Sequence, residues 1–293
     1  MVLLRIRILF AAIIGELVKL SYRIYTPSFN NALNKDNSRR EKVIISLTSY
    51  GRRVNDVLPF ALYSLLSQSY KPDKIILWLD ENWNNENLPQ RITKLKEKRL
   101  VEVRYCKDIR SYKKLVPSLE LYPDDIIVTF DDDLYYRPNL LKRLIEGHEN
   151  YPNSIITHRA HRFVIKNHEV LRYDQWEQCI SDEMGNDVFP TGGAGCLYKR
   201  SLLHEDVIND KLFMELCPLA DDVWFFFMEI LKKTPRVVLK RKGFVYIPLD
   251  DFYQFFHKHS SLASQNEQES MNDVQIRDVM MHYGLTVKDG MVV

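Results

Sequence analysis

Three consecutive aspartates, Asp131 to Asp133, directly follow the apolar run at residues 126–130. A buried strand does not carry unpaired carboxylates in its middle, because an uncompensated buried charge costs several kcal/mol. The run therefore marks a strand that ends at a solvated cleft. In extended backbone, Asp131 and Asp133 would point to the same side. Such oxygen ligands suit Mg²⁺ or Mn²⁺, which bind through few carboxylates plus substrate phosphates. A solvated acidic turn is the alternative interpretation.

A second acidic pair, Asp221 and Asp222, precedes the apolar segment VWFFF. One aspartate at a helix start is explained as an N-cap. The other aspartate needs a further reason, because the apolar segment that follows buries the helix. Between the two clusters, residues 191–195 carry three glycines, which let backbone approach a ligand closely or simply form a tight turn. A cationic stretch that could meet a phosphate or an acidic sugar, or face solvent, comprises His158, Arg159, His161 and Arg162.

Strands and helices alternate through the first half of the chain. Apolar runs predict strands at residues 42–50, 74–80, 101–106 and 125–133, and helical spacing predicts helices at 56–68, 89–99, 114–121 and 138–149, with Asp56 as an N-cap. This alternation indicates a parallel sheet wrapped by helices. Ligands bind beyond the carboxyl ends of the strands in such sheets. The second half predicts strands in 154–163, after the glycine turn and in 235–247, and a helix at 220–232.

The chain divides into four segments by composition. Residues 1–29 predict an amphipathic N-terminal helix, residues 30–41 a polar linker, residues 42–262 a catalytic domain with halves 42–137 and 138–262, and residues 263–293 a helical tail. The uninterrupted apolar run of the first segment, residues 8–15, is far shorter than the ~20 residues that a spanning helix needs. Residues 1–25 are therefore expected either to contact a membrane peripherally or to pack on the domain as an ordinary helix.

Composition excludes several classes of protein. The 293 residues are 45% hydrophobic and 27% charged, which is typical of a globular protein. A net charge of +2 gives no support to nucleic-acid binding. The four cysteines form no CxxC pair and no zinc-ligand spacing, which favours reduced thiols in the cytoplasm. We expect a cytoplasmic protein, placed at the inner face of the cell membrane if the N-terminal helix binds there.

Two segments carry a resemblance to a known family. VTFDDDLYYRPNLL resembles the DxD segment of nucleotide-sugar glycosyltransferases with the GT-A fold, in particular the inverting family 2 type. SYKKLVPSLELYPDDIIV resembles the preceding segment in a bacterial capsule and lipopolysaccharide branch. The resemblance covers residues 42–259. It implies an α/β, GT-A (Rossmann-like) fold with a mostly parallel sheet flanked by helices, and transfer of a sugar from a nucleotide-diphosphate donor to a hydroxyl of a glycan or lipid-linked glycan. Residues 254–257 do not match the QxxRW motif of processive synthases, which favours transfer of a single sugar.

The resemblance also implies roles for individual residues. The metal, Mn²⁺ or Mg²⁺, would lie on Asp133 and Asp131, with His257 (or His259) as a further ligand. Asp222 would be the general base. The predicted donor-binding residues are Thr48 and Arg52 against the nucleotide, Asp80 at the base, Lys114 at the diphosphate or ribose, Asp131 at the ribose, and Asp132 beside it.

Two other functions stay open at the level of the sequence. A nucleotidyltransferase that makes nucleotide-sugars also uses carboxylate-bound Mg²⁺ on a similar sheet, but normally has a phosphate loop rich in glycine and basic residues. Here the first strand leads into LTSYGRR, which contains one glycine. A non-catalytic sugar-binding or scaffold protein is the other alternative, and the three aspartates Asp131, Asp133 and Asp222 argue against it.

Overall fold

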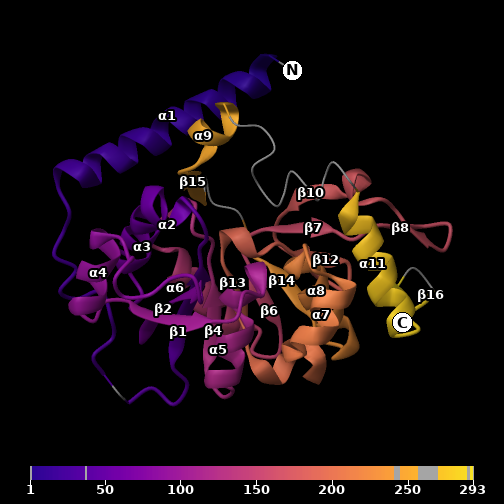
Figure 1. Cartoon of the computed structure of the whole chain (residues 1–293). Helices are drawn as coiled ribbons and strands as arrows, with labels where there is room; N and C mark the ends of the chain where they lie inside the picture. The colour runs from indigo at the N-terminus through magenta and orange to yellow at the C-terminus, as the bar shows by residue number, and fades with distance from the viewer. Residues whose placement is uncertain (1, 37, 241–244, 257–269, 289–290, 293) are drawn as a thin grey trace.

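The computed structural model describes residues 2–36, 38–240, 245–256, 270–288 and 291–292. Its centre is an eight-stranded sheet in the order β11-β14-β6-β13-β4-β1-β2-β3 (Figure 1). Strands β3, β2, β1 and β4 run parallel, and β13 is antiparallel to both β4 and β6. The strand bounds are β1 Val43–Thr48, β2 Lys74–Asp80, β3 Glu102–Cys106, β4 Ile126–Thr129, β6 Ile155–Thr157, β11 Glu183–Gly185, β13 Cys196–Tyr198 and β14 Arg236–Val238.

The first half follows the predicted alternation, with differences at helix starts. Its helices are α2 Arg53–Asp56, α3 Leu58–Leu66, α4 Gln90–Glu97, the 3₁₀ helix η1 Arg110–Lys114, α5 Val116–Leu121 and α6 Leu140–Asn150. The helix expected from residue 56 is broken at Val57, because Pro59 follows in the first turn of α3. Asp56 therefore ends α2, and its prediction as an N-cap is wrong. The predicted strand 125–133 stops at Thr129, and Asp132 and Asp133 lie in a turn.

The second half adds smaller elements around one long buried helix, α8 Asp221–Leu231. The predicted strand at 154–163 is two strands, β6 and β7 Ala160–Arg162, which belong to different sheets. The remaining elements are β8 Ile165–Lys166, β9 Glu169–Val170, η2 Tyr173–Gln175, β10 Glu177–Ile180, β12 Val188–Pro190, η3 Gly192–Ala194, η4 Arg200–Leu202, η5 Glu205–Ile208, α7 Asp210–Leu216, α11 Met271–His282, β16 Val287–Lys288 and β17 Met291–Val292.

Alternating side chains of the central strands feed two hydrophobic cores. Ile45 and its same-face neighbours pack with α3, all of whose side chains are buried. Ile44 faces the opposite way, into the core that also contains the aromatic residues of α8. This period of two is what a sheet covered on both faces requires. Because both faces of the sheet are covered, the polar side chains at the strand ends lie at its edge.

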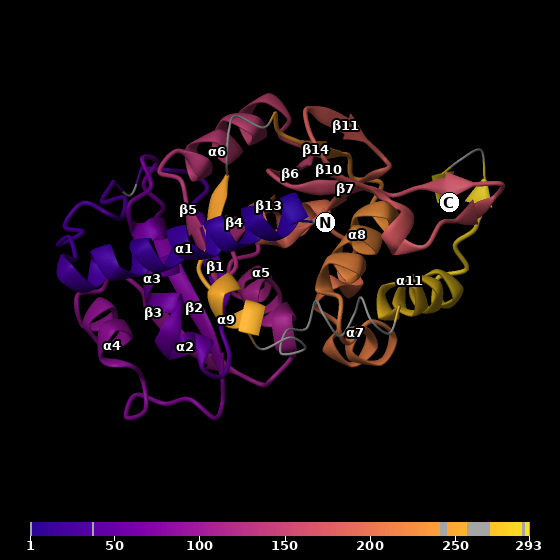
Figure 2. The same ribbon diagram turned by 90° about the horizontal axis from the view of Figure 1, so that it is seen from above.

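The N-terminal segment forms α1 Val2–Ile24. It lies beside α9 Asp251–Phe256 and β15 Tyr246–Pro248, over the first half of the chain (Figure 2). Strand β15 pairs with β5 Leu134–Tyr136, which directly follows the acidic turn. Among the described helices, none combines the length and apolar character needed to cross a membrane.

Candidate active site

The acidic loop, residues 131–133, follows the carboxyl end of β4, and hydrogen bonds to Tyr136 hold it in place. The Asp131 N–H donates to Tyr136 Oη at 2.8 Å, and that hydroxyl donates to the carbonyl of Gly193 at 2.8 Å. A Cβ at Gly193 would lie 2.7 Å from Asp131 Oδ2, so a larger residue there would displace this carboxylate. The extended backbone assumed from the sequence is not present, yet all three aspartates line one cavity.

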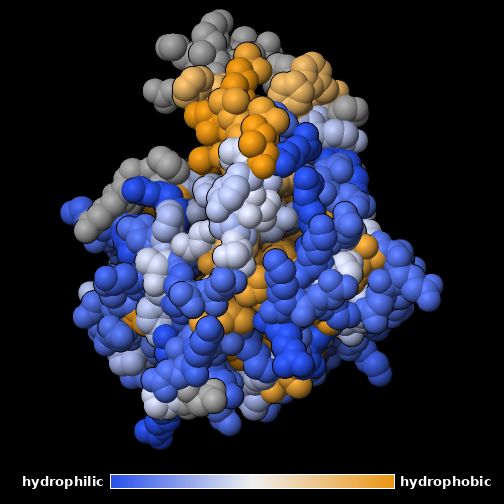
Figure 3. Space-filling model, turned by 90° about the vertical axis from the view of Figure 1, so that its left-hand side faces the viewer, coloured by the Kyte–Doolittle hydropathy of each residue, from blue (hydrophilic) through white to orange (hydrophobic). Residues whose placement is uncertain are grey.

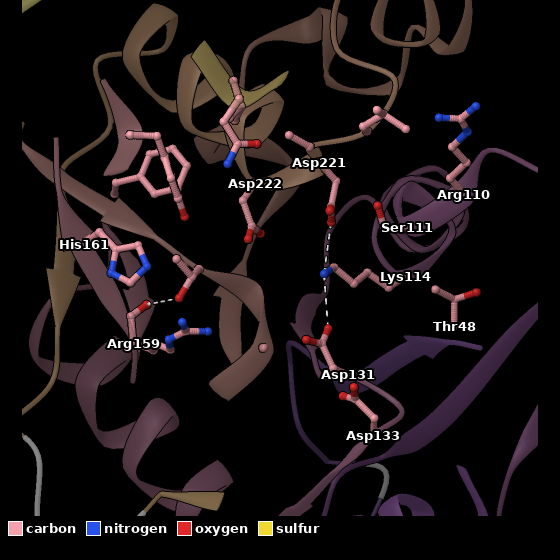
Figure 4. A pocket seen from close by; sticks show the side chains of 18 of the residues that line it. Thr48, Arg110, Ser111, Lys114, Asp131, Asp133, Arg159, His161, Asp221 and Asp222 are labelled. Atoms are coloured by element: carbon pink, nitrogen blue, oxygen red, sulfur yellow. Dashed lines mark hydrogen bonds and ion pairs between the residues drawn. The ribbon is translucent and has the colours of Figure 1, made fainter. Parts of the chain in front are cut away.

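That cavity has a volume of about 830 Å³, which is within the range of small-molecule sites. It lies at the carboxyl ends of β1 and β4, where the fold class predicts ligands. Figure 4 shows its acidic loop on one side and the Asp221–Asp222 pair on another, with Lys114 between them. The cavity brings together six of the residues predicted for donor, metal and base roles: Thr48, Lys114, Asp131, Asp132, Asp133 and Asp222.

Lys114 ends η1 and joins the two acidic groups. Its Nζ lies 3.3 Å from Asp131 Oδ1 and 3.0 Å from Asp221 Oδ2, and the side chain is almost fully buried. Burial alone would lower the pKa of Lys114, but the carboxylates of Asp131, Asp221 and Asp222 raise it well above its ordinary value. The ammonium group therefore stays charged at the floor of the cavity.

Asp222 is the second residue of α8 and accepts a hydrogen bond from the Gly192 N–H at 3.0 Å. Burial, and then the neighbouring Asp221, raise its pKa to about 7, with Lys114 acting in the opposite direction. A carboxylate with that pKa is suited to accept a proton at neutral pH. The N-cap of α8 is Ala220, without a side-chain hydrogen bond, so the predicted capping role of one aspartate is wrong.

Arg53 binds the rest of the acidic loop, whereas the residue predicted from the sequence was its neighbour Arg52. Its guanidinium lies 3.1 Å from Asp132 Oδ1, 3.0 Å from Asp133 Oδ2 and 3.3 Å from Asp250 Oδ2. Asp132 also accepts a hydrogen bond from the Ser49 hydroxyl and is 4% exposed. Burial raises the pKa of Asp133 to about 7, even though Arg53 opposes the shift. Asp132 is thus the anchored member of the loop.

Two predicted donor-binding residues are not among those that line the cavity. Arg52 forms a bidentate ion pair with Asp250, at 2.7 and 2.8 Å, and its guanidinium lies 3.3 Å from the centre of the Tyr253 ring. Asp80 is 7% exposed and accepts the N–H of Asn82 at 3.0 Å. The Arg52–Arg53 doublet was the sequence signal for Arg53, but only the start of α2 decides which arginine faces the acids.

The cationic stretch divides between core and cavity. His158 is buried against the Leu140 carbonyl, and burial lowers its pKa to about 4. Arg162 pairs with three carboxylates outside the cavity, those of Glu177, Glu183 and Asp187. Arg159 and His161 line the cavity, as do residues that the sequence analysis missed, among them Arg53, Arg110, Ser111 and Arg172.

The acidic loop offers oxygen donors of the kind that hard divalent cations bind, but Arg53 and Lys114 already pair with these carboxylates. Five carboxylates, from residues 131–133 and 221–222, line the cavity around Arg53 and Lys114. Arg53 pairs with Oδ2 of Asp133, and Lys114 pairs with Oδ1 of Asp131. No group of three His, Cys, Asp or Glu side chains within the described residues is arranged to hold an ion. The predicted ligand His257, with its alternative His259, lies outside the described residues.

Some solved structures resemble the chain at low sequence identity. No curated protein sequence matches the chain. The solved structures that resemble it include S. aureus TarS 1–349 in complex with UDP (14% identity, TM-score 0.47, 83% of this chain and 72% of that one). They also include CMP:2-keto-3-deoxy-manno-octonic acid synthetase complexed with CTP (10% identity, TM-score 0.44, 78% of this chain and 100% of that one).

The sheet with helices on both faces and an N-terminal helix is the GT-A (Rossmann-like) fold expected from the sequence. Residues 44–209, more than half of the chain, match the model of one family, and they contain β1, the acidic loop and the glycine turn. The chain belongs to glycosyl transferase family 2.

Proposed function

We propose that this chain is an inverting, metal-dependent glycosyltransferase that moves a single sugar from a nucleotide-diphosphate donor to a hydroxyl of a glycan or lipid-linked glycan. The observation that carries the proposal is the position of Lys114, whose ammonium group lies between Asp131 and Asp221 in one cavity. A buried, permanently charged lysine there offers a site for a diphosphate, and Asp222 stands next to it as a base.

On the donor side, Thr48 and Lys114 would contact the nucleotide and its diphosphate. Asp131 and Asp133 would hold Mn²⁺ or Mg²⁺, which supplies positive charge to a departing phosphate when bound. Burial, and then the neighbouring carboxylates, raise the pKa of Asp133 against the opposing effect of Arg53, and a bound cation would favour the charged form. Asp132, which Ser49 and Arg53 hold, would support the loop. Base recognition by Asp80 stays a prediction.

On the acceptor side, the Asp222 carboxylate takes the proton of the attacking hydroxyl. The acceptor oxygen forms its bond to the anomeric carbon while the bond from that carbon to the diphosphate oxygen breaks, and the nucleoside diphosphate leaves. Attack from the face opposite the leaving group inverts the anomeric centre. The Gly192 N–H keeps Asp222 oriented through this step. Assembly of capsule or lipopolysaccharide, and a position at the inner face of the cell membrane, also stay predictions.

The test combines binding and turnover. A panel of nucleotide-sugars is added with Mn²⁺ while thermal stability and nucleoside diphosphate release are measured. The correct donor should stabilise the protein by about 2.7 kcal/mol at a hundred times its Kd. Lys114→Met should abolish this gain. The matched control Lys107→Met, at an exposed lysine paired with Asp210, should not.

Each alternative gives a different result in the same assay. A nucleotidyltransferase would consume nucleoside triphosphate with a sugar phosphate and release pyrophosphate. A sugar-binding scaffold would be stabilised by a ligand without turnover. Either result contradicts the proposal.

A further inference from the structure

A group of exposed apolar side chains gathers on the outer side of α1 and α9. We call it the apolar ridge, and Figure 3 shows hydrophobic side chains at the top of the molecule over α1. Its members on α1 recur every three or four residues, so they share one face of the helix. They are 40–79% exposed, and the ridge comprises Leu9, Phe10, Ile13, Leu17, Leu20 and Ile24 of α1 with Phe252 and Phe256 of α9.

The opposite face of α1 is fixed to the protein. Ala12 is 2% exposed, and a Cβ at Gly15 would lie 2.2 Å from the carbonyl oxygen of Pro248 in β15. The absence of a side chain at Gly15 lets α1 pack closely against β15 at this point. A helix held in this way cannot stand upright through a bilayer. Its outer face is therefore available to a flat apolar surface that meets it side-on.

The charges of α1 indicate which surface that is. Its sequence contains Arg5, Arg7 and Arg23, whereas its one acidic residue, Glu16, pairs with Lys19. The excess of basic over acidic residues in the sequence of α1 matches anionic lipid headgroups over an acyl layer. A second copy of the chain would instead bring the same net positive charge to the contact. We infer that the apolar ridge seats this protein on an anionic bilayer and that its acceptor is anchored in that bilayer.

The second part of this inference rests on the proposed function and on the position of α9. Gln254, between the two exposed phenylalanines of α9, lines the cavity and donates to Asp250 Oδ2 at 3.2 Å. The Leu249 N–H donates to the carbonyl of Asp133 at 2.8 Å. The ridge and the acidic loop are therefore joined by one short segment. An acceptor held in the membrane meets the cavity beside the surface on which the protein rests.

Vesicle flotation tests the seating without any need for activity. The full chain is mixed with vesicles of phosphatidylcholine alone or of phosphatidylcholine with phosphatidylglycerol. It should float with the anionic vesicles and be released by salt. Leu17→Glu should weaken binding at least about tenfold. Leu121→Glu, a matched control at an exposed leucine 42% accessible on α5, should bind like the unmodified chain.

Three results would overturn the seating: no flotation of the unmodified chain, unchanged flotation of Leu17→Glu, or a dimer in solution that Leu17→Glu dissociates. The last would assign the ridge to a second copy.

The acceptor class is tested by the fate of a radiolabelled donor sugar. Membrane lipids and water-soluble glycans from the cell of origin are offered separately, and label should enter the organic phase and depend on Leu17. Label only in the water-soluble glycan contradicts the anchored acceptor while it leaves glycosyl transfer intact. Flotation without donor turnover contradicts the proposed function and leaves the seating intact. The two failures are thus distinguishable.

Discussion

The replacement Asp222→Asn tests the proposed base most directly. Asparagine has nearly the same shape, and its side-chain oxygen can still accept the Gly192 N–H, so the turn at the cavity should keep its geometry. What changes is the ability to take a proton. General base catalysis contributes roughly 10²- to 10⁴-fold to a rate, so kcat should fall by about that factor. The donor KM should change little, because the proposal assigns Asp222 to the acceptor hydroxyl.

The pH profile of kcat/KM adds a second readout. The pKa of Asp222 is raised to about 7, so the carboxylate is protonated below that pH and inactive as a base. Activity of the unmodified chain should rise tenfold per pH unit below about 7 and level off above it. Asp222→Asn should lose this rise, because asparagine cannot take up the proton.

Asp221→Asn provides the matched control, because it changes the neighbouring carboxylate by the same atom. Asp221 lies 3.0 Å from the Lys114 ammonium, so its loss should weaken donor binding while kcat falls less. The assay is release of nucleoside diphosphate at saturating donor, with and without acceptor. A normal rate in Asp222→Asn, or an unchanged pH profile, would refute the assignment.

Three further predictions concern the carboxylates and their partners. Asp133→Asn should remove Mn²⁺-dependent donor binding in a thermal shift assay, whereas Asp132→Asn should mainly lower the melting temperature; equal Mn²⁺ responses would contradict the metal role. Arg53→Met should destabilise the fold by about 3–5 kcal/mol in urea unfolding, against about 1 kcal/mol or less for the more exposed Arg52→Met. Burial raises the pKa of Glu229 from 4.5 to about 8. The contribution of Glu229 to the free energy of unfolding should therefore be greatest below pH 4.5. It should fall by a few kcal/mol as the pH rises to about 8, and Glu229→Gln should remove this pH dependence.

The sequence by itself determined the fold class, because the fold class depends on the local pattern of apolar residues. Short apolar runs with helical segments between them specify strands and crossovers, and a triple aspartate after such a run has to emerge at a strand end. The cavity also contains Lys114 and Asp222, which lie on helices and were indicated by the resemblance to the family. Thr48 and the acidic loop reach the cavity because they lie at the ends of β1 and β4. Strand ends of one parallel sheet meet at one edge, so their order along the chain is sufficient.

Only the tertiary structure decided what each polar side chain faces. The choice between Arg52 and Arg53 depends on one residue of helix register, and a helix turns by about 100° per residue. Arg53 also forms an ion pair with Asp250, which lies outside the acidic loop and nearly two hundred positions away in the sequence. The pKa values of Asp133 and Asp222 likewise depend on burial and on charges that the fold brings together. Pattern is local, but the electric field at a carboxylate is a sum over neighbours in space, and only the folded chain supplies those neighbours.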